Sequence, residues 1–119
     1  MKEHYDRLWQ SGEKMGMNIP FSRDELSKEI QKVIDALTEP RLYIRLILTR
    51  GEGSIGLDPN LSENYNLVII GKPLSEYPDE WYSKGIHIVV ATNVIRNHAK
   101  ATDPSIKSGN YLNLSLIHI

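Results

Sequence analysis

A lysine near the C-terminal end of the chain stands in a setting that suits covalent chemistry. Lys107 follows the β-prone Ile106 and precedes the run Ser-Gly-Asn-Tyr at residues 108–111. An amine at the end of a strand, followed by small residues and a phenol, can trap an aldehyde. The amine attacks only when unprotonated, so burial must lower its pKa from about 10.4. The pattern alone allows both such a nucleophile and an ordinary surface lysine.

Two polar side chains alternate with apolar ones in a segment of strong strand character, residues 41–50. Tyr43 and Arg45 fall on one face of this predicted strand, because successive side chains point to opposite sides. The opposite face is wholly apolar and consists of Leu42, Ile44, Leu46 and Leu48. The polar face is either solvated, or it presents a hydroxyl and a guanidinium to an anion such as a carboxylate.

A glycine pattern and the histidines could indicate nucleotide and metal binding, but the neighbouring sequence does not support either site. Gly51-x-Gly53-x-x-Gly56 follows a predicted strand, as in a dinucleotide-binding fingerprint. That fingerprint needs a helix next, whereas Leu57-Asp58-Pro59-Asn60 is typical of a turn, so a tight loop is favoured. The four histidines show no metal-ligand spacing and the chain has no cysteine, so we expect no metal site.

The composition is that of an ordinary globular domain. The chain has 119 residues, of which 40% are hydrophobic and 24% charged, and its formal net charge is −1. This balance gives no basic surface for nucleic acid and no polybasic segment for a membrane. We see no signal peptide and no long apolar segment, so the expected location is the cytoplasm.

The elements that must position these residues are predicted from periodicity. One helix is expected at residues 2–16, and Gly16 is the glycine expected to end it. A second helix is expected at residues 22–37, where Ser22 and Glu25 form a capping box at its start. Strands are expected at 41–50, 66–71 and 86–92, the first two antiparallel, with a linker at 72–74 and a turn or short helix at 75–84. This order predicts an α+β or α/β fold: two helices, antiparallel strands, a linker and the start of a second domain.

Four motifs resemble those of the fold-type IV pyridoxal-phosphate enzymes, which are the class IV aminotransferases, and follow one another in the family's order. Within this family they are most similar to the branched-chain amino-acid aminotransferases. Residues 3–8 resemble the family's Glu-His-x-x-Arg-Leu helix, with Ser11 after it, and residues 43–45 resemble its Tyr-Ile-Arg strand. Tyr82-x-x-Gly-Ile followed by Arg96 resembles the approach to the lysine. Residues 107–113, Lys-Ser-Gly-Asn-Tyr-Leu-Asn, resemble the cofactor-lysine motif, which is the most specific of the four.

The resemblance implies a role for each matching residue. Lys107 would bind the aldehyde of pyridoxal 5'-phosphate and shuttle the proton during catalysis. Arg7, by default an exposed helix arginine, would bind the phosphate, and Tyr111 would hydrogen-bond the cofactor's phenolic oxygen. Tyr43 and Arg45 would lie near the substrate carboxylate. In a full-length parent protein, a homodimeric, cytoplasmic enzyme, the reaction would move the amino group of Leu, Ile or Val to 2-oxoglutarate, with an amino acid and a 2-oxo acid as partners. We expect the 119-residue chain by itself to be inactive.

Other readings stay open beside this one. D-amino-acid aminotransferases and aminodeoxychorismate lyases share the lysine and the phosphate arginine, although their motifs look less similar. The family also has segments before and after the matched region, including a glutamate that pairs with the pyridine nitrogen. We therefore expect an incomplete N-terminal small domain at 1–72, the beginning of the C-terminal cofactor domain at 73–113 and a non-native tail at 114–119. The alternative is a non-catalytic fragment, or a small α+β interaction domain without cofactor.

Overall fold

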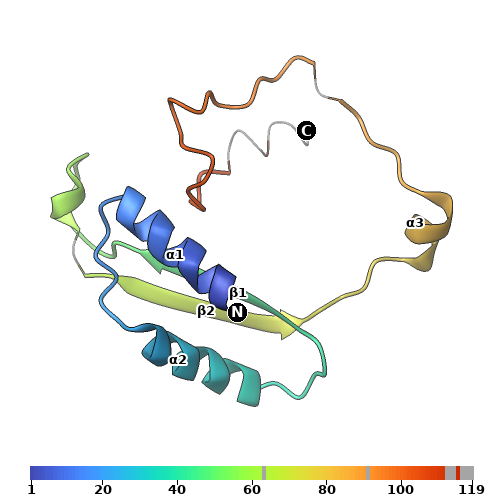
Figure 1. Ribbon diagram of the computed structural model, residues 1–119, viewed down its shortest axis with the longest axis horizontal. Helices are drawn as coiled ribbons and strands as arrows, with labels where there is room; N and C mark the ends of the chain where they lie inside the picture. The colour runs from blue at the N-terminus through green and yellow to red at the C-terminus, as the bar shows by residue number, and fades with distance from the viewer. Residues whose placement is uncertain (63, 91, 112–114, 116–119) are drawn as a thin grey trace. The chain divides into compact units, whose positions relative to one another are not determined.

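The computed structural model describes residues 1–62, 64–90, 92–111 and 115 (Figure 1). The chain divides into two compact units. Met17–Glu76 is here called the hairpin unit, and Met1–Gly16 together with Tyr77–Ile119 is called the lysine unit. The last two residues of the lysine motif, 112 and 113, and the predicted tail at 114–119 lie outside the described residues, except Ser115.

The hairpin unit is built on two antiparallel strands, β1 (Leu42–Thr49) and β2 (Asn66–Pro73). This confirms the antiparallel pairing predicted from the sequence. Strand β2 runs two residues further than predicted, so Lys72 and Pro73 belong to the sheet and not to a linker. The register places Lys72 directly opposite Tyr43.

Helix α2 (Arg23–Asp35) covers one side of this hairpin (Figure 1). Its predicted capping box is present: the hydroxyl of Ser22 accepts from the backbone N–H of Glu25 at 3.2 Å, and the Glu25 carboxylate accepts from the Ser22 N–H at 2.7 Å. These bonds lower the pKa of Glu25. Leu26 and Ile30, one turn apart, are 0% and 2% exposed and form the centre of the apolar face.

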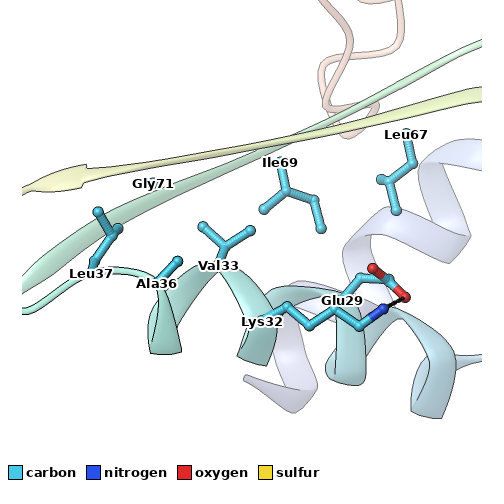
Figure 2. Close-up of a pocket in the computed structure, with 8 residues that line it drawn as sticks. All are labelled: Glu29, Lys32, Val33, Ala36, Leu37, Leu67, Ile69 and Gly71. Carbon is cyan, nitrogen blue, oxygen red and sulfur yellow. Dashed lines mark hydrogen bonds and ion pairs between the residues drawn. The ribbon is translucent and has the colours of Figure 1, made fainter.

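Side chains of residues 33 and 37 approach the sheet closely at Gly71 of β2. A Cβ atom there would lie 2.7 Å from side-chain atoms of both Val33 and Leu37, so a larger residue would push the helix away. Figure 2 shows the groove between the two elements, which has a volume of about 440 Å³ and carries the ion pair of Glu29 with Lys32 at its rim. The absence of a side chain at position 71 therefore leaves room for the side chains of Val33 and Leu37.

The glycine-rich loop after β1 folds back on the chain that follows it. Gly51 has φ +85°, and a Cβ atom there would lie 1.6 Å from the carbonyl oxygen of Asn64. At Gly53 the same atom would lie 2.0 Å from the carbonyl oxygen of Leu61. The next element is the three-residue 3₁₀ helix η1 (Pro59–Leu61), not the α-helix of a dinucleotide site. The glycines thus serve close backbone packing, which confirms the tight loop.

The lysine unit contains helices α1 (Lys2–Lys14) and α3 (Asp79–Lys84). Helix α1 ends two residues earlier than predicted, and Gly16 takes φ +63° and donates its N–H to the carbonyl of Glu13 at 2.9 Å, as expected of a glycine that follows a helix end. Helix α3 is the short helix predicted within residues 75–84, where Tyr77 and Trp81 stack with ring centroids 5.3 Å apart.

The strand predicted at residues 86–92 is wrong for the described part of that range. Residues 86–90 and 92 are not in a strand, and the described strands β1 and β2 pair only with each other. Ile88 and Val89 are 82% and 92% exposed. A strand needs a neighbour to take its backbone hydrogen bonds, and the described residues offer none to this segment, whatever its intrinsic propensity.

Candidate functional site

Lys107 is attached to helix α1 through its backbone. Its N–H donates to the hydroxyl of Ser11 at 3.0 Å, across a sequence separation of 96 residues. Ser11 is only 3% exposed, so this bond is part-buried. The attachment holds the backbone from which the Lys107 side chain extends.

A second attachment lies just before the lysine. The amine of Lys14 donates to the Asp103 carboxylate at 2.9 Å and to the hydroxyl of Ser105 at 2.5 Å. The other carboxylate oxygen of Asp103 accepts from the hydroxyl of Ser105 at 2.6 Å and from its N–H at 2.9 Å. The Ser105 hydroxyl, with Lys14 next in importance, lowers the pKa of Asp103 to about 2. The loop leading to Lys107 is thus held by a charged network.

Three residues of α1 share the face that holds this loop. Arg7, Ser11 and Lys14 are spaced four and three residues apart, which places them on one side of a helix. The guanidinium of Arg7 donates to Nδ1 of His4 at 3.1 Å, and no carboxylate pairs with it among the described residues. Because Ser11 accepts the hydrogen bond from the Lys107 backbone, Arg7 lies one helical turn from the point where the loop meets α1.

The side chain of Lys107 meets Tyr111. The amine donates to the phenolic oxygen at 3.3 Å and lies 5.4 Å from the ring centroid. Both side chains are exposed, so the burial expected of an aldehyde-trapping lysine is not found among the described residues. The lysine unit therefore combines an amine in contact with a phenol and, on the anchoring helix, a guanidinium.

Tyr43 and Arg45 lie in the hairpin unit, on the exposed face of β1. The amine of Lys72 lies 5.3 Å from the centroid of the Tyr43 ring, and Arg45 pairs with Ile70 on the same face. Among the described residues no carboxylate pairs with Arg45 or Lys72. Sequence reasoning missed Lys72 because it was assigned to a linker. Continuing the alternation of β2 through Gly71 would have found it.

Two other kinds of feature are absent from the described part of the chain. It contains no group of three or more His, Asp or Glu side chains that could hold a metal ion. It also contains no helix that is long and apolar enough to cross a membrane.

Comparison with known proteins places this arrangement in a family context. The family described as amino-transferase class IV matches residues 1–118. A Methanocaldococcus jannaschii protein named as a branched-chain-amino-acid aminotransferase is 32% identical over 119 residues, which is 100% of this chain and 40% of the relative. A Rickettsia felis protein of the same name is 36% identical over 91 residues, or 76% of this chain and 30% of the relative. The chain thus spans 40% or less of the length of these relatives.

Proposed function

Since this chain belongs to the class IV aminotransferases, we propose that the protein moves the amino group of Leu, Ile or Val to 2-oxoglutarate with pyridoxal 5'-phosphate as cofactor. The names of the relatives support the branched-chain substrate class. The observation that carries the proposal is the contact of Lys107 with Tyr111, on a loop anchored to the helix that bears Arg7. The family resemblance also supports a cytoplasmic homodimer as part of this proposal.

The lysine unit fits pyridoxal phosphate by the chemistry of its donor groups. The Lys107 amine suits the aldehyde, and the Arg7 guanidinium, whose only partner among the described residues is Nδ1 of His4, suits a phosphate dianion. The phenol of Tyr111 suits the oxygen next to the aldehyde. When bound, this cofactor supplies an electron sink for the substrate's α-carbon.

The protein's own residues then have separable tasks. We assign the movement of the substrate's α-proton to Nζ of Lys107, which must be uncharged when it accepts that proton. Tyr111, whose oxygen lies 3.3 Å from this nitrogen, orients the amine. Arg7 holds the phosphate by charge-assisted hydrogen bonds and so fixes the other end of the cofactor.

The exposed face of the hairpin is our candidate for recognition of substrate carboxylates. Arg45 and Lys72 carry two positive charges that no described carboxylate neutralises, and Tyr43 lies against Lys72. Two cations on diagonal positions of one sheet face suit a dicarboxylic acid such as 2-oxoglutarate better than a monocarboxylic one. This supports the amino acceptor that we propose.

Aldehyde capture tests the proposal directly. Pyridoxal phosphate is titrated into the chain, the visible absorption is followed, and the adduct is reduced with borohydride and located by mass spectrometry. We expect one equivalent on Lys107 and loss of that adduct in Lys107→Ala. Lys100→Ala, which removes another exposed lysine of the same unit, should keep it. Equal labelling of the Lys107→Ala variant would overturn the proposal.

The second candidate is a non-catalytic interaction domain. It is favoured by the exposure of Ile88 and Val89 and by the exposed position of Lys107. The same titration separates the two, because an interaction domain would show no Lys107-dependent adduct. Assays with L- and D-leucine on the active protein would distinguish the branched-chain reading from a D-amino-acid aminotransferase.

A further inference from the structure

Two attachments join the loop of residues 103–107 to helix α1, and together they are here called the α1 latch. Its members are Ser11 and Lys14 on the helix, and Asp103 and Ser105 on the loop. The charged attachment lies at the start of the loop, and the part-buried attachment, to the Lys107 N–H, lies at its end. Both ends of the segment that precedes the reactive side chain are therefore held by the same helix.

The segment between the two attachments is itself a tight turn. The N–H of Ile106 donates to the carbonyl of Asp103 at 3.1 Å, and the Asp103 carboxylate accepts from the N–H of Ser105. A turn closed by its own hydrogen bonds and attached at both ends can neither slide along the helix nor rotate on it freely. The position of the Lys107 backbone relative to α1 is thus determined by named side chains.

We propose that Ser11 and Lys14 are positioning residues that hold Lys107 at a fixed offset from Arg7, so that a ligand bearing both an aldehyde and a phosphate engages both residues at once. This inference rests on the proposed function. Arg7, Ser11 and Lys14 share one face of α1. The latch therefore attaches Lys107 to the same helix face that carries the proposed phosphate-binding guanidinium.

A fixed offset has a measurable consequence for binding. When two binding groups are held at the separation of a two-headed ligand, the second contact is intramolecular and benefits from a high effective concentration. When the groups move independently, ordering them consumes part of the binding free energy. The latch should therefore affect a phosphorylated aldehyde more than the same aldehyde without its phosphate.

The test compares pyridoxal phosphate with pyridoxal as probes. The ratio of their affinities, measured by absorption titration, is the phosphate advantage. We expect Ser11→Ala to lower this advantage by about two- to tenfold, the range for one hydrogen bond. Lys14→Gln should lower it by up to about fivefold, because its ion pair is exposed. Lys14→Arg, which keeps the charge, should restore most of the advantage.

A matched control exists in the same unit. Lys84 also makes an ion pair, with Glu80 at 3.1 Å, which is more exposed than that of Lys14; it lies on α3 and does not hold the lysine loop. Lys84→Gln should therefore leave the phosphate advantage at its wild-type value. Amide hydrogen exchange without any cofactor gives an independent readout: Ser11→Ala should accelerate exchange at the Lys107 N–H, and Lys84→Gln should not.

The outcomes separate this inference from the proposed function. If Arg7→Gln lowers the phosphate advantage but Ser11→Ala and Lys14→Gln do not, the positioning role is wrong and the function stands. If Arg7→Gln leaves the advantage unchanged, the proposed phosphate site is wrong. A wild-type chain without any phosphate advantage overturns both.

Discussion

The hairpin unit and the lysine unit are held together by different forces. The hairpin unit has a capped helix, with Leu26 and Ile30 buried, beside a paired sheet. The lysine unit joins α1 to a long, largely irregular segment, to which Ser11 and Lys14 are connected by hydrogen bonds and an ion pair. Apolar burial contributes most to stability, whereas exposed ion pairs contribute little.

This difference indicates a division of labour between scaffold and chemistry. A unit stabilised by apolar burial keeps its structure without help from a ligand. A unit positioned by a few polar contacts has a defined geometry at low local stability, which is where functional segments are commonly found. The residues proposed for cofactor binding, Arg7, Lys107 and Tyr111, all belong to the second kind of unit.

The largest expected effect is removal of the hairpin unit's central side chain. Leu26→Ala should lower the free energy of unfolding by about 2–5 kcal/mol, because Leu26 is fully buried. The matched variant in the lysine unit, Ile88→Ala, should change it by less than about 0.5 kcal/mol, because Ile88 is 82% exposed. Urea denaturation followed by circular dichroism measures both. Equal losses would contradict the contrast between the units.

A pair of glycines tests the same contrast at the backbone. Gly51 and Gly85 both have positive φ. A Cβ atom at Gly51 would collide with Asn64, whereas a Cβ atom at Gly85 would meet nothing within 4 Å. Gly51→Ala should destabilise by roughly 2–4 kcal/mol, from strain and overpacking together, and Gly85→Ala by roughly 1–2 kcal/mol from strain alone. Amide exchange in β1 and β2 reports the first change. A larger loss of unfolding free energy from Gly85→Ala than from Gly51→Ala would contradict the contrast between the two units.

The smallest effect is the response of the latch to acid. The pKa of Asp103 is about 2 in the folded chain against an ordinary 3.8. The pKa of Asp103 is lower in the folded chain than in the unfolded chain. The ionised carboxylate therefore stabilises the folded state fully above pH 3.8, and this stabilisation is lost as the pH falls through about 2. We expect the NMR resonances of Lys14 and Ser105 to titrate near pH 2, and this step to vanish in Asp103→Asn. Titration at 3.8 would show that the latch is open in solution.

The parts of the fold predicted correctly are those with local signals. The capping box of Ser22 and Glu25, the alternation in residues 42–49 and the glycine after α1 each act within a few residues. The strand predicted at 86–92 failed because a strand depends on a partner that the segment's own sequence cannot supply.

The candidate site divides in the same way. The identities of Lys107, Tyr111 and Arg7 came from motifs, and the contact between Lys107 and Tyr111 spans only four residues. The latch could not be predicted, because its partners are 89 to 96 residues apart and a serine or lysine on a helix gives no signal of its distant partner. Lys72 was missed for a simpler reason, which is that the end of β2 was placed two residues too early.

The bond between Ser11 and Lys107 also has a kinetic consequence. It closes a loop across 96 residues, and the entire hairpin unit lies within that loop in the sequence. Contacts between residues so distant in sequence form late, because the entropy of closing the loop must be overcome before the contact contributes. During synthesis, α1 leaves the ribosome long before the lysine does. We therefore expect the proposed cofactor site to assemble after the hairpin unit.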